Sequence, residues 1–276
     1  VQDFGALYAS VKSHGKSMGQ IIETYIGKTG RKLFFLFCWL FTLLVIAAFA
    51  DMVAGSLNGY NAAGAQSLPS GAASSITILY VFVAIAFGFF LKKTGLSGWK
   101  QAVLGIALIV AMLALGIAFP VYFTKQTWVY LVFVYIFFAS VTPIWVLKQP
   151  RDYLTTFLFI GMIVAAVVGV FVSNPTITDT ATPFIKFSVG VTGLISQFGF
   201  PQEWGLCIMT MFVSALALTS LDAVARIGRL SFQELFEVNE EVETHSVVAF
   251  LTNKYVATLI TLAGGYLLSL GGYLNI

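Results

Sequence analysis

The chain has 276 residues, of which 58% are hydrophobic and only 10% are charged. Its formal net charge is +3 and its mean hydropathy is +0.90. Soluble domains carry about 25% charged residues, so this composition excludes a soluble globular domain and indicates a membrane protein. Cys38 and Cys207 lie in apolar runs without disulfide or metal-ligand spacing, and we interpret both as small buried hydrophobic residues.

Seven stretches are long and apolar enough to cross a bilayer, for which about 20 residues suffice. They are free of charge except at their ends or at Asp51 and Asp222. The sequence therefore predicts an all-α fold, a polytopic transmembrane helix bundle that forms one transmembrane domain over residues 1–276. The predicted spans are about 33–55, 72–91, 101–123, 127–147, 153–172, 204–225 and 255–273.

The basic residues predict the orientation of the spans. If alternate connectors share a side of the membrane, one side carries only Lys125 and Lys186. Cytoplasmic loops are enriched in Lys and Arg, so we place the richer side, and the N-terminal segment of the chain, in the cytoplasm. The residues on that side are Lys12, Lys16, Lys28, Arg31, Lys32, Lys92, Lys93, Lys100, Lys148, Arg151, Arg226, Arg229 and Lys254.

Residues 13–32 precede the first predicted span and are too polar to cross the membrane. Apolar residues recur at helical spacing from Met18 to Ile26, and Ser17 stands at an N-cap position. One interpretation is an amphipathic helix lying at the cytoplasmic interface. The other is an ordinary cytosolic helix packed on the bundle.

The sequence offers no enzyme signature. His14 and His245 lie in polar connectors, with no His or Cys at ligand spacing, and no Walker loop, GxSxG or HExxH pattern is present. We predict that the protein is not an enzyme and uses no metal or other cofactor, and we expect no nucleic-acid partner. A membrane-embedded enzyme would need a nucleophile or a metal cluster.

Ionisable groups near membrane depth are the candidates for function, because a charge at mid-bilayer costs roughly 2.5–3.5 kcal/mol. Asp222 and Arg226 stand four residues apart, on one helical face, with Thr219 one turn earlier. The functional interpretation is an Asp222–Arg226 pair in proton coupling or gating, with Thr219 donating to the carboxylate. The alternative is a structural salt bridge at the cytoplasmic helix end, with Arg226 reaching the interface.

The stretch "LKQPRDYL" is a second candidate. Pro150 is predicted to end one span, and Arg151 and Asp152 to form the tight cytoplasmic turn into the next. Helix capping accounts for Asp152, because an acid is favoured at a helix start. A stiff charged turn between two helices is also a candidate gate.

Three more polar residues are candidates for the substrate path. Asp51 ends the first predicted span, either hydrated at the outer interface or lining an outward-facing vestibule. Gln2 and Asp3 form a third polar group at a helix end. The glycine pairs in "LAGGYLLSLGGYLNI" allow either close helix approach or a broken helix that exposes carbonyls.

Four blocks carry a family resemblance: "VQDFGALYASVKSHGKSMGQIIETYIGKTGR", "ASVTPIWVLKQPRDYLTTF", "ALTSLDAVARIGRLSFQELFE" and "LTNKYVATLITLAGGYLLSLGGYLNI". Together they resemble the carbon starvation protein A (CstA) family of bacterial and archaeal inner-membrane transporters. The resemblance implies a multi-pass protein of the inner membrane with an inverted-repeat fold like that of amino acid/polyamine/organocation transporters. It also implies that family segments are absent from this chain, before "QDF", after "TITDTATP" and beyond "GGYLNI".

The function that the resemblance implies is proton-coupled secondary uptake of peptides during carbon starvation. A pyruvate/proton symporter of the same family is the alternative, and a non-transporting sensor or structural subunit is another. The expected partners are a small-molecule substrate, the proton and the lipid bilayer. The sequence leaves the oligomeric state open.

Overall fold

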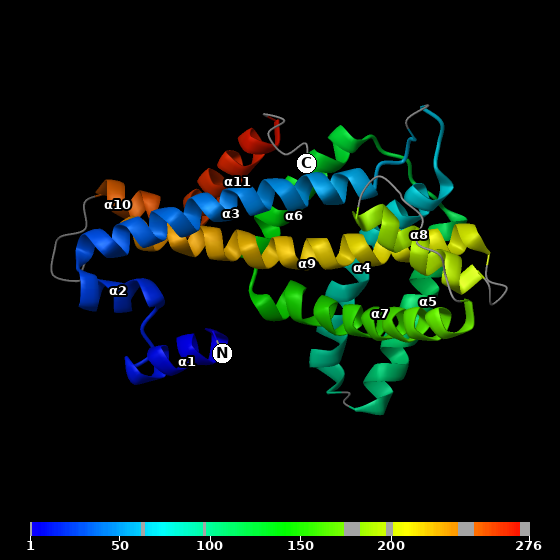
Figure 1. The fold of residues 1–276 in the computed structure, drawn as a ribbon, viewed down its shortest axis with the longest axis horizontal. Helices are drawn as coiled ribbons and strands as arrows, with labels where there is room; N and C mark the ends of the chain where they lie inside the picture. Colours follow the sequence, from blue (N-terminus) through cyan, green and yellow to red (C-terminus); the bar gives the residue numbers. More distant parts are fainter. Residues whose placement is uncertain are drawn as a thin grey trace. The chain divides into compact units, whose positions relative to one another are not determined.

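The computed structural model describes residues 2–61, 64–95, 98–173, 183–196, 201–236 and 246–270. Throughout these ranges the fold is all-α, and the one β feature is an isolated bridge between Tyr60 and Gln66 (Figure 1). The helices are α1 (Gln2–Lys12), α2 (Met18–Ile26), α3 (Lys28–Ser56), α4 (Leu68–Thr94), α5 (Trp99–Ala118), α6 (Lys125–Val141), α7 (Ile144–Ser173), α8 (Pro183–Ser196), α9 (Gln202–Phe236), α10 (Ser246–Leu251) and α11 (Lys254–Leu270).

The chain divides into two compact units. The first unit comprises Val1–Ala48 and Ala223–Ile276, and the second comprises Phe49–Asp222. The second unit therefore contains α4 to α8, the end of α3 and the first part of α9.

In the second unit, α4 packs against both α5 and α7, and Figure 1 shows the three helices as neighbours. Glycines allow these helices to come into close contact. A Cβ atom added to Gly88 of α4 would overlap the ring of Pro150 of α7, and one added to Gly116 of α5 would overlap Ile76 of α4. Small residues permit close helix contact in membranes, so these glycines bring the backbones of α4, α5 and α7 together.

Four helices of the described part are long and apolar enough to cross a membrane: α3, α4, α5 and α9. They overlap the predicted spans 33–55, 72–91, 101–123 and 204–225. A fifth crossing is formed if α6 and residues 144–164 of α7 make one bent span, with an angle of 118° between them. The predicted span 255–273 overlaps α11, which is shorter. The total of seven crossings and the single transmembrane domain stay predictions.

The structure differs from the prediction around Pro150. The predicted turn at Pro150–Asp152 is wrong, because α7 continues from Ile144 to Ser173 with Pro150 inside it. The chain breaks earlier, between α6 and α7 at Thr142 and Pro143. Proline removes one helical hydrogen bond and disfavours the helical conformation of the residue before it, so either proline can end a helix. Here Pro143 is the one that does.

In the first unit, α2 begins with a full capping box. The Ser17 hydroxyl accepts from the Gln20 N–H, and the Gln20 side chain accepts from the Ser17 N–H. The Ser17 hydroxyl also donates to Glu234 of α9 at 3.1 Å. The predicted N-cap at Ser17 is therefore present, whereas residues 28–32 of the predicted 13–32 segment belong to α3. A position at the membrane interface stays a prediction.

The first glycine pair of "LAGGYLLSLGGYLNI" lies inside α11. Cβ atoms added to Gly264 and Gly265 would lie 3.1 Å from Leu43 and 3.0 Å from Ile46 of α3. The Trp39 indole of α3 also donates to the Thr261 hydroxyl of α11, at 3.1 Å. This pair serves close packing of α11 on α3. The second pair, Gly271 and Gly272, lies outside the described residues.

Candidate functional site

A buried ion pair joins α7 to α9 in the second unit. Arg151 Nη2 lies 2.6 Å from Asp222 Oδ2, and the two side chains are 1% and 0% exposed. Removing two charges from water costs several kcal/mol per ion, and their mutual attraction repays this cost only where the geometry is good and further hydrogen bonds form. The surroundings of the pair therefore decide whether it is stable.

Two hydroxyl groups form hydrogen bonds to the pair. The Tyr135 hydroxyl of α6 donates to Asp222 Oδ2 at 3.0 Å and accepts a hydrogen bond from Arg151 Nη1. The Thr219 hydroxyl of α9 accepts from Arg151 Nη2 at 3.2 Å. Tyr135 thus bonds both charged partners, and each hydroxyl supplies a polar contact that water would otherwise provide.

A second set of hydrogen bonds fixes the backbone of Arg151. Its carbonyl oxygen accepts from the Tyr80 hydroxyl of α4 at 2.6 Å and from the Thr155 hydroxyl at 3.0 Å. Tyr80 and Thr155 also share a hydrogen bond with each other. Tyr80 is 2% exposed, so its hydrogen bond joins α4 to α7 in the interior of the second unit. Side chains of four helices, α4, α6, α7 and α9, therefore build one polar network, which we call the Arg151–Asp222 cluster.

Three sequence candidates, Asp222, Arg151 and Thr219, lie together in this cluster. The Thr219 hydroxyl accepts from Arg151, whereas the prediction had it donating to the carboxylate. The ion pair of Asp222 is with Arg151 of another helix. Arg226 lies one turn beyond Asp222 on α9, half-buried, and belongs to the first unit. Its pairing with Asp222 stays a prediction.

The remaining candidates lie elsewhere. Asp152 follows Arg151 on α7, is half-buried, and forms no ion pair within the described residues. Asp51 of α3 pairs with Lys125, at 2.8 Å, in an exposed bridge at the N-terminus of α6. The position of both residues on the outer side of the membrane stays a prediction. Gln2 and Asp3 begin α1, and their side chains are outside the described part of the structure.

Sequence reasoning missed Tyr135 and Tyr80. Both tyrosines occur in apolar runs, "LVFVYIFF" and "ITILYVFV", and we interpreted the many aromatic residues as ordinary membrane filling. A phenol in such a run signals that a hydroxyl must find a partner. The partner lies on another helix, so the pattern along one helix does not reveal it. Among the described residues, no three His, Cys, Asp or Glu side chains gather as a metal site would require.

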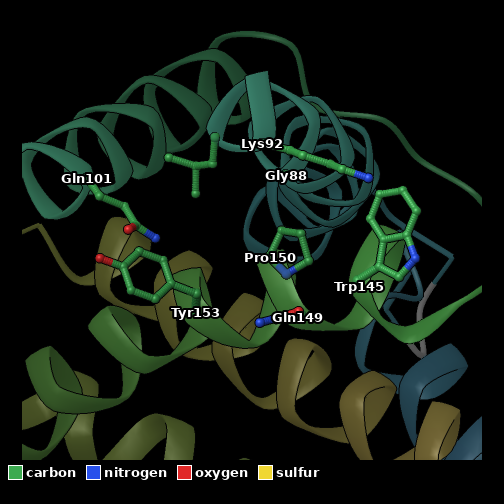
Figure 2. Close-up of a pocket in the computed structure, with 8 residues that line it drawn as sticks. Gly88, Lys92, Gln101, Trp145, Gln149, Pro150 and Tyr153 are labelled. Atoms are coloured by element: carbon green, nitrogen blue, oxygen red, sulfur yellow. The ribbon is translucent and has the colours of Figure 1, made fainter. Parts of the chain in front are cut away.

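A pocket of about 410 Å³ opens between α4, α5 and α7 of the second unit. Figure 2 shows Lys92 and Trp145 on one side, Gln101 and Tyr153 on the other, and Pro150 with Gln149 between them. Gly88 and Leu91 complete the lining. The pocket is thus bounded by the same stretch of α7 that carries Arg151, but Arg151 itself turns toward α6 and α9.

Comparison with known proteins identifies relatives of this chain. The family model described as carbon starvation protein CstA matches residues 1–185 and 176–276. The peptide transporter CstA of Bacillus subtilis is 33% identical over 67% of this chain and 31% of its own length. The pyruvate/proton symporter BtsT of Escherichia coli is 31% identical over 63% of this chain and 24% of its own length.

A third relative covers almost the whole chain. The peptide transporter CstA of Mycobacterium tuberculosis (strain CDC 1551 / Oshkosh) is 26% identical over 97% of this chain and 34% of its own length. The chain spans about a quarter to a third of the length of these curated relatives. No solved structure matches the chain.

Proposed function

The chain belongs to the carbon starvation protein CstA family, and from this we propose that it is part of a proton-coupled secondary transporter that takes up peptides across the plasma membrane. The proposal is supported by the apolar helices α3, α4, α5 and α9, which are long enough to cross a membrane. It is also supported by relatives in Bacillus subtilis and Mycobacterium tuberculosis that are named peptide transporters. Because these relatives are named as transporters, the proposal assigns no enzymatic reaction.

Pyruvate is the second candidate substrate, because one relative is named a pyruvate/proton symporter. Peptides and pyruvate share one chemical feature, a carboxylate group. A guanidinium binds a carboxylate with two parallel hydrogen bonds, which adds both energy and geometric specificity. The substrate class that we propose is therefore a small carboxylated solute, with peptides first and pyruvate second.

The observation that carries the proposal is the buried Arg151–Asp222 pair. In a membrane interior, ionisable residues that pair with one another are typical of proton relays and ion pathways. We assign the coupling proton to Asp222. When Asp222 binds a proton, its charge is lost, and Arg151 keeps its hydrogen bonds to the hydroxyls of Tyr135 and Thr219.

Substrate then replaces the lost charge. The carboxylate of the substrate pairs with Arg151 while Asp222 is protonated, so proton and substrate occupy the cluster together. Deprotonation of Asp222 on the other side restores the ion pair and releases the substrate. This exchange of one carboxylate for another couples the two binding events, because a buried guanidinium without a counter-charge is costly. Arg226 and Asp152 have no assigned step and stay candidates for gating.

Uptake by the purified protein in proteoliposomes tests the proposal. Labelled dipeptide and labelled pyruvate are supplied with and without an inward proton gradient. Accumulation of dipeptide that requires the gradient supports a peptide/proton symporter, and accumulation of pyruvate alone selects the second substrate. Absence of uptake and of binding for both substrates would favour a non-transporting sensor or structural subunit.

A further inference from the structure

We propose that the pocket between α4, α5 and α7 binds the headgroup of an anionic phospholipid. Its volume of about 410 Å³ lies within the range of roughly 300–1,000 Å³ that is usual for small-molecule sites. This proposal does not depend on the transport function. It rests on the donors that line the pocket, on the absence of acid among the lining residues, and on the apolar surface around it.

Among the described residues of the lining, Lys92 is the one cation and none carries a carboxylate. Lys92 belongs to the last turn of α4, and its ammonium lies 4.0 Å from the ring centroid of Trp145. This cation–π contact holds the ammonium at one wall of the pocket while leaving N–H groups for a ligand. Within the described part of the chain, no carboxylate pairs with Lys92. A negatively charged group in the pocket would therefore supply the missing counter-charge.

Three further residues of the lining carry neutral hydrogen-bond donors. They are Gln101, Gln149 and Tyr153, and Figure 2 shows Gln101 and Tyr153 on the wall opposite Lys92 and Gln149 between the walls. The structure gives these groups no hydrogen bond to other described residues. One cation with neutral donors suits a phosphodiester, whose oxygens accept several hydrogen bonds and carry one charge.

The surroundings favour a lipid over a soluble anion. Large apolar side chains beside the lining residue Trp145 are exposed: Phe89 of α4, whose ring contacts that of Trp145, is 52% exposed, and Ile144, its neighbour in α7, is 57% exposed. In a membrane protein such side chains face acyl chains. A headgroup in the pocket thus leaves its acyl chains beside an apolar surface, whereas a free phosphate would not use that surface.

The predicted position in the membrane also favours a lipid. The distribution of Lys and Arg predicts that Lys92, Lys93 and Lys100 lie on the cytoplasmic side. Basic pockets between transmembrane helices on that side are sites where anionic lipid headgroups bind. Trp145 is a typical residue of the interface between lipid and water, and it is 45% exposed.

Lipid titration followed by native mass spectrometry of the purified protein tests the proposal. The probes are phosphatidylglycerol, phosphatidylcholine and inorganic phosphate. We expect phosphatidylglycerol to bind more tightly than phosphatidylcholine, and Lys92→Gln to weaken its binding about tenfold, because a hydrogen bond between the ammonium and the phosphate is lost. Tyr153→Phe combined with Gln101→Ala should also weaken it, without any change of charge.

Lys93→Gln is the matched control, because Lys93 lies in the same helical turn but outside the lining. It should change the binding of phosphatidylglycerol less than twofold, since only its diffuse charge is lost. An equal loss in Lys92→Gln and Lys93→Gln would overturn the proposal, because it would indicate general surface charge. Displacement of phosphatidylglycerol by millimolar inorganic phosphate would overturn the lipid assignment and indicate a free-anion site.

Discussion

Arg151 of α7 and Asp222 of α9 form an ion pair of 2.6 Å whose side chains are 1% and 0% exposed. Tyr135 bonds to both partners, and Tyr80 bonds to the backbone of Arg151. Through these hydrogen bonds, the ion pair connects α4, α6, α7 and α9. A change to either charge should alter both the free energy of unfolding and the proposed proton coupling.

Removal of one charge should destabilise the protein more than removal of both. Arg151→Gln leaves the Asp222 carboxylate buried without its cation, which typically costs about 3–5 kcal/mol. The double variant Arg151→Gln/Asp222→Asn leaves no uncompensated charge, so we expect it to be more stable than Arg151→Gln. Reversible unfolding in detergent measures both free energies. Additive losses in the double variant would contradict a direct interaction.

Tyr135→Phe should destabilise the cluster without changing its charge. The hydroxyl donates to Asp222 and accepts from Arg151, so its removal leaves both charged groups short of a hydrogen bond. We expect a loss of about 1–3 kcal/mol in the free energy of unfolding. Tyr25→Phe is the control, because Tyr25 is 81% exposed and should change stability by less than about 0.5 kcal/mol. Equal effects in the two variants would remove Tyr135 from the cluster.

Gly88→Ala should disturb the contact of α4 with α7. The added methyl group would overlap the ring of Pro150, and a proline ring held in a helix has little freedom to move away. Overpacking of this kind costs about 1–3 kcal/mol. Gly161→Ala of α7 is the control, since no atom lies within 4 Å of the added Cβ and alanine favours the helix. A destabilised Gly161→Ala with a stable Gly88→Ala would contradict this packing.

The Asp51–Lys125 bridge should contribute little to stability. Its side chains are 39% and 48% exposed, and exposed ion pairs are worth about 0–1 kcal/mol and are screened by salt. Lys125→Met should therefore lower the free energy of unfolding by less than about 1 kcal/mol. The small loss should shrink further at high ionic strength. A loss as large as that of Arg151→Gln would show that this bridge is structurally dominant.

The sequence predicts the fold class because the bilayer restricts the choice. Long apolar runs in a membrane form helices, since backbone groups must bond within the segment. This is why α3, α4, α5 and α9 fall close to predicted spans. The position of the break between α6 and α7 is harder to predict, because the sequence alone does not distinguish Pro143 from Pro150. One tertiary contact supports the helix at Pro150, since the Tyr80 hydroxyl of α4 bonds the carbonyl of the next residue, Arg151.

The candidate site is predicted only in part. Asp222, Thr219 and Arg151 stand out because they are polar residues next to apolar runs. The rule for residues four apart points to Arg226 as the partner of Asp222, because it considers one helix at a time. One observed partner of Asp222, Arg151, comes from another helix, and the bridging Tyr135 comes from a third. Pairings between helices depend on tertiary packing, which periodicity does not encode.

Accumulation of labelled dipeptide in proteoliposomes, driven by a proton gradient and compared between the native protein and Asp222→Asn, tests the central claim most directly. The substituted amide cannot carry the coupling proton, and it leaves Arg151 without its counter-charge. We therefore predict that Asp222→Asn does not accumulate dipeptide above equilibrium. It should still bind dipeptide, and the part of the pH dependence of the affinity that arises from protonation of Asp222 should be absent. Gradient-driven accumulation by Asp222→Asn at the native level would contradict the account.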